Sequence, residues 1–330
     1  MSEVPAVSAA SLERKETRRR SFLVDLIIRL VREKPLGTVG GIIVLLLLFA
    51  GIFADLLAPY GMNESHLDAT FQPPSSQYWL GTDNLGRDFL SRIIFGARIS
   101  VIVGVCAAAL DVLVSTLIGV LSGYFGSKTD IVIQRFVDAW MCFPSIFLLL
   151  TIMALLGPGL FQVILVLGVS SGIRGSRVVR SAVIGIKRNI FIEAATAIGA
   201  PTRQIVLRHI LPNIMAPIII IFSLSMGASI LAESTLSFLG FGIPPPAPSW
   251  GGMLSSEGRY YMNTAPWMAI WPGLALSIVV YGTNMLGDAL RDLLDPRLRG
   301  GLGRYGGAEK KRQKLIKKKR IETESPGVAR

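Results

Sequence analysis

Six long apolar runs constrain the fold of this chain more than any other feature. The first covers residues 38–58, and the others lie near 99–123, 131–156, 161–183, 214–236 and 267–290. A bilayer core requires about 20 consecutive apolar residues per helix, and each run supplies that length. Only 17% of the 330 residues are charged, whereas a soluble domain carries about 25%. The sequence therefore predicts an all-α membrane protein with six transmembrane helices.

The distribution of Lys and Arg predicts the orientation of these helices. Residues 1–37, 174–213 and 291–330 hold eight, seven and thirteen of them, whereas 59–98 and 237–266 hold three and one. Because cytoplasmic segments carry the excess of positive charge, we expect a multi-pass protein of the plasma (cell inner) membrane with both termini cytoplasmic. The net charge of +12 is then mainly a topology signal, and it predicts no nucleic-acid partner.

These boundaries predict five regions of the chain. They are a cytoplasmic N-terminal tail (1–37), a first transmembrane helix (38–58), an extracytoplasmic loop (59–96), a core of five helices (97–292) and a basic cytoplasmic C-terminal tail (293–330). Within the last region, "KKRQKLIKKKR" at 310–320 is interpreted as a tail with a topology role. Attraction to anionic membrane lipid is the alternative.

The sequence predicts no enzyme, no cofactor and no metal site. "GVSSG" at 168–172 fits the G-x-S-x-G pattern of serine hydrolases, but His66 and His209 both lie outside the apolar runs. A serine nucleophile needs a base within hydrogen-bond reach, so we interpret 168–172 as a small-residue face for close helix packing. Cys106 and Cys142 lie far apart in the sequence and are interpreted as structural.

Two of the predicted spans carry polar, small residues on one face. The first set is Gly104, Ala108, Asp111, Ser115, Gly119 and Ser122, and the second is Ser225, Ser229, Glu233 and Ser237. A carboxylate at membrane depth normally faces a bundle interior or a wet cavity. Asp111 and Glu233 are therefore predicted to line a passage for a hydrophilic solute. Helix packing against buried donors is the alternative for both.

A polar, helix-prone segment, "EAATAIGAPTRQIVLRHILPN" at 193–213, stands between two apolar runs. Its first part favours a helix with Glu193 in the first turn, where the helix dipole favours a negative charge. Gly199 suits a left-handed C-terminal cap, and Pro201 suits the first turn of a second helix that ends at Pro212. One apolar side of the first helix would be formed by Ile190, Ala194, Ala197 and Ile198. We expect two short amphipathic helices joined at a sharp bend, a shape that fits a groove on another protein.

This segment is similar to the EAA loop of ATP-binding-cassette (ABC) importer permeases. In that family, Glu-Ala-Ala, three residues and Gly are followed at a distance by an apolar residue and Pro. The matching positions are Glu193, Ala194, Ala195, Gly199 and Pro212. Three further stretches, at 80–100, 233–251 and 284–300, resemble the C-type permease subunit of the dipeptide/oligopeptide/nickel group. The likeness extends from about residue 22 to residue 300.

The resemblance implies a type I ABC importer permease fold, with the EAA loop at 189–213 forming cytoplasmic coupling helices. It also implies three kinds of partner: a second, unlike permease, two ATP-binding subunits and an extracytoplasmic solute-binding protein. Short peptides are the expected solute, and nickel chelates or other small solutes of the same group are alternatives. A secondary transporter without ATPases is the alternative from a different class, and it would need ion-coupling groups at the membrane midplane.

Overall fold

The computed structural model describes residues 22–294 and is built from helices joined by loops. In chain order the helices are α1 (Phe22–Glu33), α2 (Pro35–Ile52), α3 (Ala54–Leu57), the 3-10 turn Leu67–Ala69, α4 (Phe89–Phe125), α5 (Ser127–Cys142), α6 (Ser145–Leu156), α7 (Leu160–Lys187), α8 (Ile190–Ala197), α9 (Thr202–Gln204), the π-helical turn Ile205–Ile210, α10 (Leu211–Asn213), α11 (Met215–Phe238), α12 (Trp250–Met253), the π-helical turn Leu254–Gly258 and α13 (Trp267–Leu294). Most of the two predicted tails lies outside the described residues.

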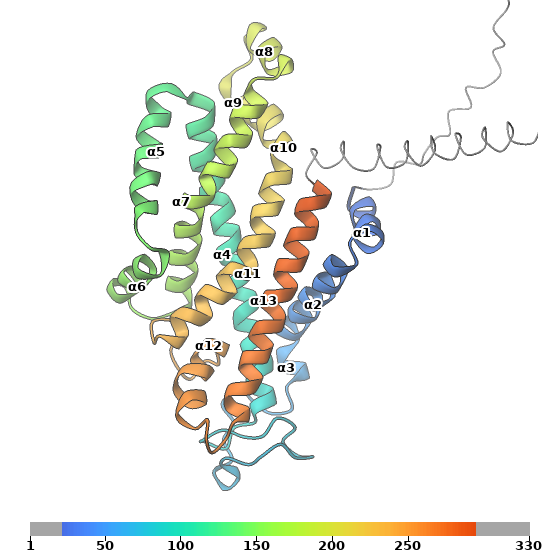
Figure 1. Ribbon diagram of the computed structural model, residues 1–330, viewed down its shortest axis with the longest axis vertical. Helices are drawn as coiled ribbons and strands as arrows, with labels where there is room; N and C mark the ends of the chain where they lie inside the picture. Colours follow the sequence, from blue (N-terminus) through green and yellow to red (C-terminus); the bar gives the residue numbers. More distant parts are fainter. Residues whose placement is uncertain (1–21, 295–330) are drawn as a thin grey trace, which may run out of the picture.

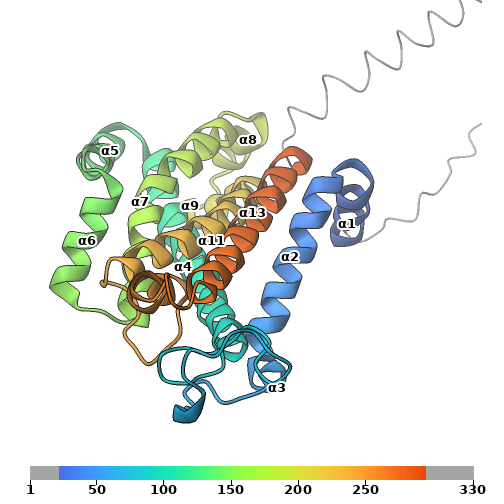
Figure 2. The same cartoon turned by 60° about the horizontal axis from the view of Figure 1, so that its bottom comes forward.

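The axes of the long helices are roughly parallel to one another (Figure 1). Figure 1 shows α4, α7, α11 and α13 along the long axis, with α8 at one end. The loop before α4 and the short helix α12 lie at the opposite end, which comes forward in Figure 2. We call these two ends the α8 end and the loop end. Figure 2 also shows α2 beside α13, on the side away from α5 and α6.

Glycines allow α4 and α7 to approach closely. A Cβ placed on Gly119 of α4 would lie 2.6 Å from the Cβ of Val179 on α7, so a side chain there would push the helices apart. Gly168 and Gly172 of α7 lie in the same way against side chains of α4. Small residues at such positions are the usual device for packing membrane helices. The packing interpretation of 168–172 is confirmed, and Ser170 is buried.

In the described part of the chain, fewer helices than the six predicted are long and apolar enough to cross a membrane. Within residues 22–294, four qualify, namely α2, α4, α11 and α13. The pair α5 and α6 makes a fifth if it is taken as one span, but the two helices are bent by 92°. The run at 131–156, predicted as one span, is therefore broken into two helices. The helix ends at Cys142 and resumes at Ser145, because Pro144 has no N–H and disfavours helix at the residue before it.

Two predicted boundaries also differ from the structure. The first span was expected at 38–58, but α2 ends at Ile52 and the short helix α3 follows. The boundary expected between residues 96 and 97 falls inside α4, which begins at Phe89. Asp88 starts α4 early because its side chain accepts a hydrogen bond of 2.8 Å from the N–H of Ser91, as a good N-cap residue does.

Two of the three arginines of α7 are paired with carboxylates of α5. Arg180 Nε lies 2.6 Å from Asp130 Oδ1, and Arg177 forms an ion pair with Asp138. The 28 residues of α7 are long enough to cross a bilayer, but α7 is not among the four qualifying helices. The carboxylates of α5 compensate the charge of Arg177 and Arg180, so α7 can belong to the helix bundle although it carries several arginines.

Candidate functional site

The segment at residues 189–213, which we call the elbow segment, projects at the α8 end (Figure 1). Its first helix, α8, has Glu193 in the first turn, as predicted. The helix ends at Ala197, and Gly199, two residues further on, has a φ of +79°. The N–H of Gly199 donates to the carbonyl of Thr196, and the N–H of Ala200 donates to that of Ala195, both at 3.0 Å. This is a Schellman cap, in which the left-handed position favours glycine.

The second half of the elbow segment follows the prediction except for a π-helical turn in its middle. Pro201 stands directly before α9, and the helical path continues through the π-helical turn Ile205–Ile210 into α10. Pro212 was expected to end this helix, and the helical path does end one residue later, at Asn213. Pro212 has no N–H to donate, and the wide π turn directly before α10 is where the hydrogen-bond pattern adjusts.

The elbow segment has a buried side and an exposed side. Its buried side packs on the end of α7 through a cluster made of Val179, Val183, Ile192, Ala195, Ile205, Ile210 and Ile214. On the opposite side, Ile190 is 82% and Ile198 is 85% exposed. Glu193 and Ala194 are exposed beside them. The predicted apolar side of α8 is therefore the outer one, and an exposed apolar face on a rigid helix is typical of a docking surface.

Asp111 and Glu233 both lie inside the single chain. Asp111 is 2% exposed, and its Oδ2 accepts a hydrogen bond from Ser225 of α11. Glu233 is 0% exposed. Its Oε1 accepts a hydrogen bond of 2.6 Å from Ser237, and its Oε2 accepts one of 3.3 Å from Ser234. These positions correspond to the packing alternative that the sequence left open, and a role for either residue in a passage stays a prediction.

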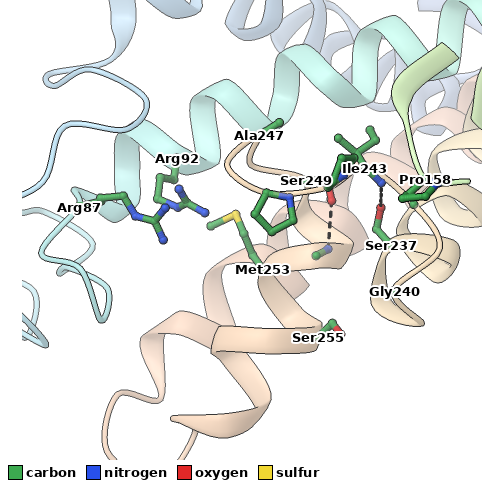
Figure 3. Close-up of a pocket in the computed structure, with 14 residues that line it drawn as sticks. Arg87, Arg92, Pro158, Ser237, Gly240, Ile243, Ala247, Ser249, Met253 and Ser255 are labelled. Atoms are coloured by element: carbon green, nitrogen blue, oxygen red, sulfur yellow. Dashed lines mark hydrogen bonds between the residues drawn. The ribbon is translucent and has the colours of Figure 1, made fainter.

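A cavity of about 220 Å³ lies at the loop end and is lined in part by Ser237, the partner of Glu233. Figure 3 shows Arg87 and Arg92 on one side of it and Ser237 and Ser249 on another. Ser237 Oγ accepts a hydrogen bond from the N–H of Ile243, and Ser249 Oγ accepts one from the N–H of Gly252. The serines therefore order the chain between α11 and α12.

Sequence reasoning assigned no role to "DNLGRD" at 83–88, whereas the structure gives it one. Asp83 is fully buried and accepts hydrogen bonds from the N–H groups of Leu85 and Arg87, at 2.8 and 2.9 Å. Its Oδ2 lies 2.6 Å from Arg87 Nε and 3.6 Å from Arg92 Nε. The Asp83 carboxylate thus holds both the turn at 83–87 and the side chains of Arg87 and Arg92. The spacing Asp-x-x-x-Arg just before an N-cap aspartate is the signal that could have indicated it.

A helical protein with several membrane spans and an exposed helical elbow at one end has the features of a transport permease. Residues 115–300 match the family model described as "Binding-protein-dependent transport system inner membrane component". Residues 21–74 match "N-terminal TM domain of oligopeptide transport permease C". The first match covers more than half of the chain, so the chain belongs to this family of ABC transport permeases. It is a multi-pass inner-membrane transport protein and not an enzyme.

Curated relatives match along most of the chain. It is 40% identical to the dipeptide transport system permease protein DppC of Alkalihalophilus pseudofirmus, over 82% of this chain and 88% of the relative. It is 36% identical to the oligopeptide transport system permease protein OppC of Bacillus subtilis, over 91% and 97%. It is 39% identical to the glutathione transport system permease protein GsiD of Pectobacterium atrosepticum, over 81% and 89%. The chain is thus a permease of the OppC/DppC type.

Proposed function

We propose that this chain forms half of the passage of an ATP-driven importer for short peptides. The observation that carries the proposal is the extent of the similarity: permeases named for dipeptides and oligopeptides match 82% and 91% of the chain. Glutathione is a second candidate, because relatives named for it match almost as well. Membership in a binding-protein-dependent family disfavours the secondary transporter.

The elbow segment is proposed to couple this subunit to an ATPase. Glu193 and Ala194 lie on its exposed side and would contact the ATPase, whereas Ala195 is buried and holds α8 against the chain. Gly199 sets the bend, and Pro212 lies in the second helical part. The burial of one side against α7 supports transmission, because a displacement of a packed helix end displaces the helix to which it is fixed.

The complete importer is proposed to contain a second, unlike permease, two ATP-binding subunits and an extracytoplasmic solute-binding protein. A component of a binding-protein-dependent system requires such partners. The elbow segment at the α8 end offers a surface to the ATPase, and the loop end is left for the solute-binding protein. This division agrees with the distance between the two ends in Figure 1.

The proposed function is tested by reconstituting the importer in liposomes with its solute-binding protein. We expect ATP-dependent uptake of labelled di- and tripeptides, with glutathione and a nickel chelate assayed in parallel. Uptake of one of those two solutes, with no uptake of any α-linked di- or tripeptide, would contradict the peptide proposal. ATP-independent uptake by this chain alone would contradict the importer proposal as well.

We further propose six spans, with α7 as the fourth, and a cytoplasmic α8 end. In a variant with Cys106 and Cys142 replaced by Ser, single cysteines at Ser75 and Pro245 should react with an impermeant reagent from outside the cell. Both residues are exposed at the loop end, whereas Thr202 is exposed at the α8 end. Cysteine at Thr202 should react only after permeabilisation. Its labelling from outside would reverse the proposed orientation.

A further inference from the structure

One face of α13 is exposed and becomes polar from the middle of the helix to the α8 end. Its positions are Ile270, Leu274, Ser277, Tyr281, Asn284 and Asp288. A spacing of three or four residues places them on a single side of the helix. Tyr281 is 64% exposed, and Ser277, Asn284 and Asp288 are exposed as well.

The other two sides of α13 are occupied within the chain. Gly282 lies against Ile43 of α2, so α2 covers one side. Gly227 of α11 lies against Thr283, which places α11 on the other. Asn284 stands at the edge of this second contact, because a Cβ on Gly227 would be 3.5 Å from Asn284 Oδ1. The third side, with Tyr281 and Asn284, faces outward.

The neighbouring helix α2 shows what a lipid-facing surface of this protein looks like. Its exposed side chains are all apolar over the same depth, namely Val39, Ile42, Leu45, Leu46 and Phe49. Leu45 is 66% exposed, nearly the same fraction as Tyr281. Polar groups in the hydrocarbon region must find hydrogen-bond partners or water. The outward face of α13 is therefore unsuited to lipid, and it requires a wet or polar neighbour.

We propose that Ser277, Tyr281 and Asn284 form the wall of the passage contributed by this subunit and contact the peptide as it crosses. The inference rests on the proposed function and deepens it. These three side chains are neutral. Tyr281 and Asn284 can both donate and accept hydrogen bonds, whereas the Ser277 hydroxyl donates to the carbonyl of Gly273 at 2.7 Å and is left to accept. Such groups match the amide groups of a peptide backbone and do not select by the charge of its side chains. The wall thus suits a permease that accepts peptides of many sequences.

The first test is cysteine accessibility in the assembled importer, in the background without Cys106 and Cys142. Tyr281→Cys and Asn284→Cys should react with a charged, membrane-impermeant thiol reagent at least about tenfold faster than Leu45→Cys, the matched control on α2. A saturating transported dipeptide, with binding protein and ATP, should slow this reaction several-fold. Equal, slow reaction at all three positions would overturn the inference, and so would fast reaction that the dipeptide leaves unchanged.

The second test is transport by Asn284→Leu and Asn284→Gln. Losing one neutral hydrogen bond to the peptide should raise the KM for uptake about fivefold to tenfold. Asn284→Gln should restore most of the affinity, and stimulation of ATP hydrolysis by binding protein should remain in both variants. An unchanged KM in Asn284→Leu would overturn the inference.

The two proposals fail in different ways. If the importer carries peptides normally while Tyr281→Cys and Asn284→Cys stay unreactive, the wall is wrongly placed and the proposed function stands. If those positions react and are protected by glutathione or a nickel chelate and by no other peptide, the wall is correctly placed and the peptide proposal is wrong.

Discussion

Replacing Gly199 by Val is expected to leave the permease inserted and assembled but to uncouple ATP hydrolysis from uptake. Gly199 has a φ of +79°, a conformation that costs an L-residue about 1–2 kcal/mol, and more for a β-branched one. No atom of a residue beyond its chain neighbours lies within 4 Å of a Cβ placed there. The free-energy cost of a side chain therefore comes from the backbone conformation and not from a steric clash. The Schellman cap would open and the direction of α8 would change. Uptake should fall roughly fivefold to thirtyfold if this strain is released in the docked state.

The measurement is uptake and ATP turnover recorded in parallel in liposomes. Gly185→Val is the matched control, because Gly185 also has open space around a Cβ but lies within the helix α7. It should retain normal coupling. A second variant, Glu193→Lys, reverses the charge on the exposed side of α8 without touching the bend, and it should weaken ATPase docking. Normal transport by both Gly199→Val and Glu193→Lys would show that the elbow segment is only a connector.

The sequence predicted the features that follow from local chemistry. Gly199, followed by Pro201, indicates a helix end and a new start whatever the surroundings, and the structure has both. The face of the second span that includes Asp111 and Gly119 is also a single buried side, as its spacing predicts. The resemblance to a permease family is confirmed by the family match.

The features that the sequence did not predict depend on contacts between distant residues. Pro144 is a local signal for a break in the run from 131 to 156. The 92° angle between α5 and α6 depends instead on how α6 packs against α7, through Leu149 and Met153. The arginines of α7 disturb a hydropathy profile, and only the structure shows the pairing of Arg177 with Asp138 and of Arg180 with Asp130. A polar helix face has the same sequence pattern whether it lines a passage or packs against a neighbouring helix. Only the structure shows that Asp111 accepts a hydrogen bond from Ser225 of α11.

Replacing Asp83 by Ala is expected to cause the largest loss of stability among single changes at the loop end. Its carboxylate is buried and lies 2.6 Å from Arg87 Nε and 3.6 Å from Arg92 Nε. Both arginine side chains are at most 7% exposed. Removing one partner of a buried ion pair leaves buried charge uncompensated and costs about 3–5 kcal/mol. The turn at 83–87 would also lose two hydrogen bonds to backbone N–H groups.

Asp55→Ala is the matched control for this prediction. Asp55 also pairs with an arginine of α4, Arg98, at 2.7 Å, but the Asp55 side chain is 77% exposed. An exposed pair is screened by water and contributes little. The melting temperature of the purified permease should therefore fall clearly in Asp83→Ala and hardly in Asp55→Ala, and protease should cut the loop at 59–88 faster in the former. Equal melting of the two variants would mean that Asp83 does not hold the loop. The alternative would then be that Asp83 mainly neutralises the two arginines that line the cavity of Figure 3, and its loss would instead change the affinity of the loop end for the solute-binding protein.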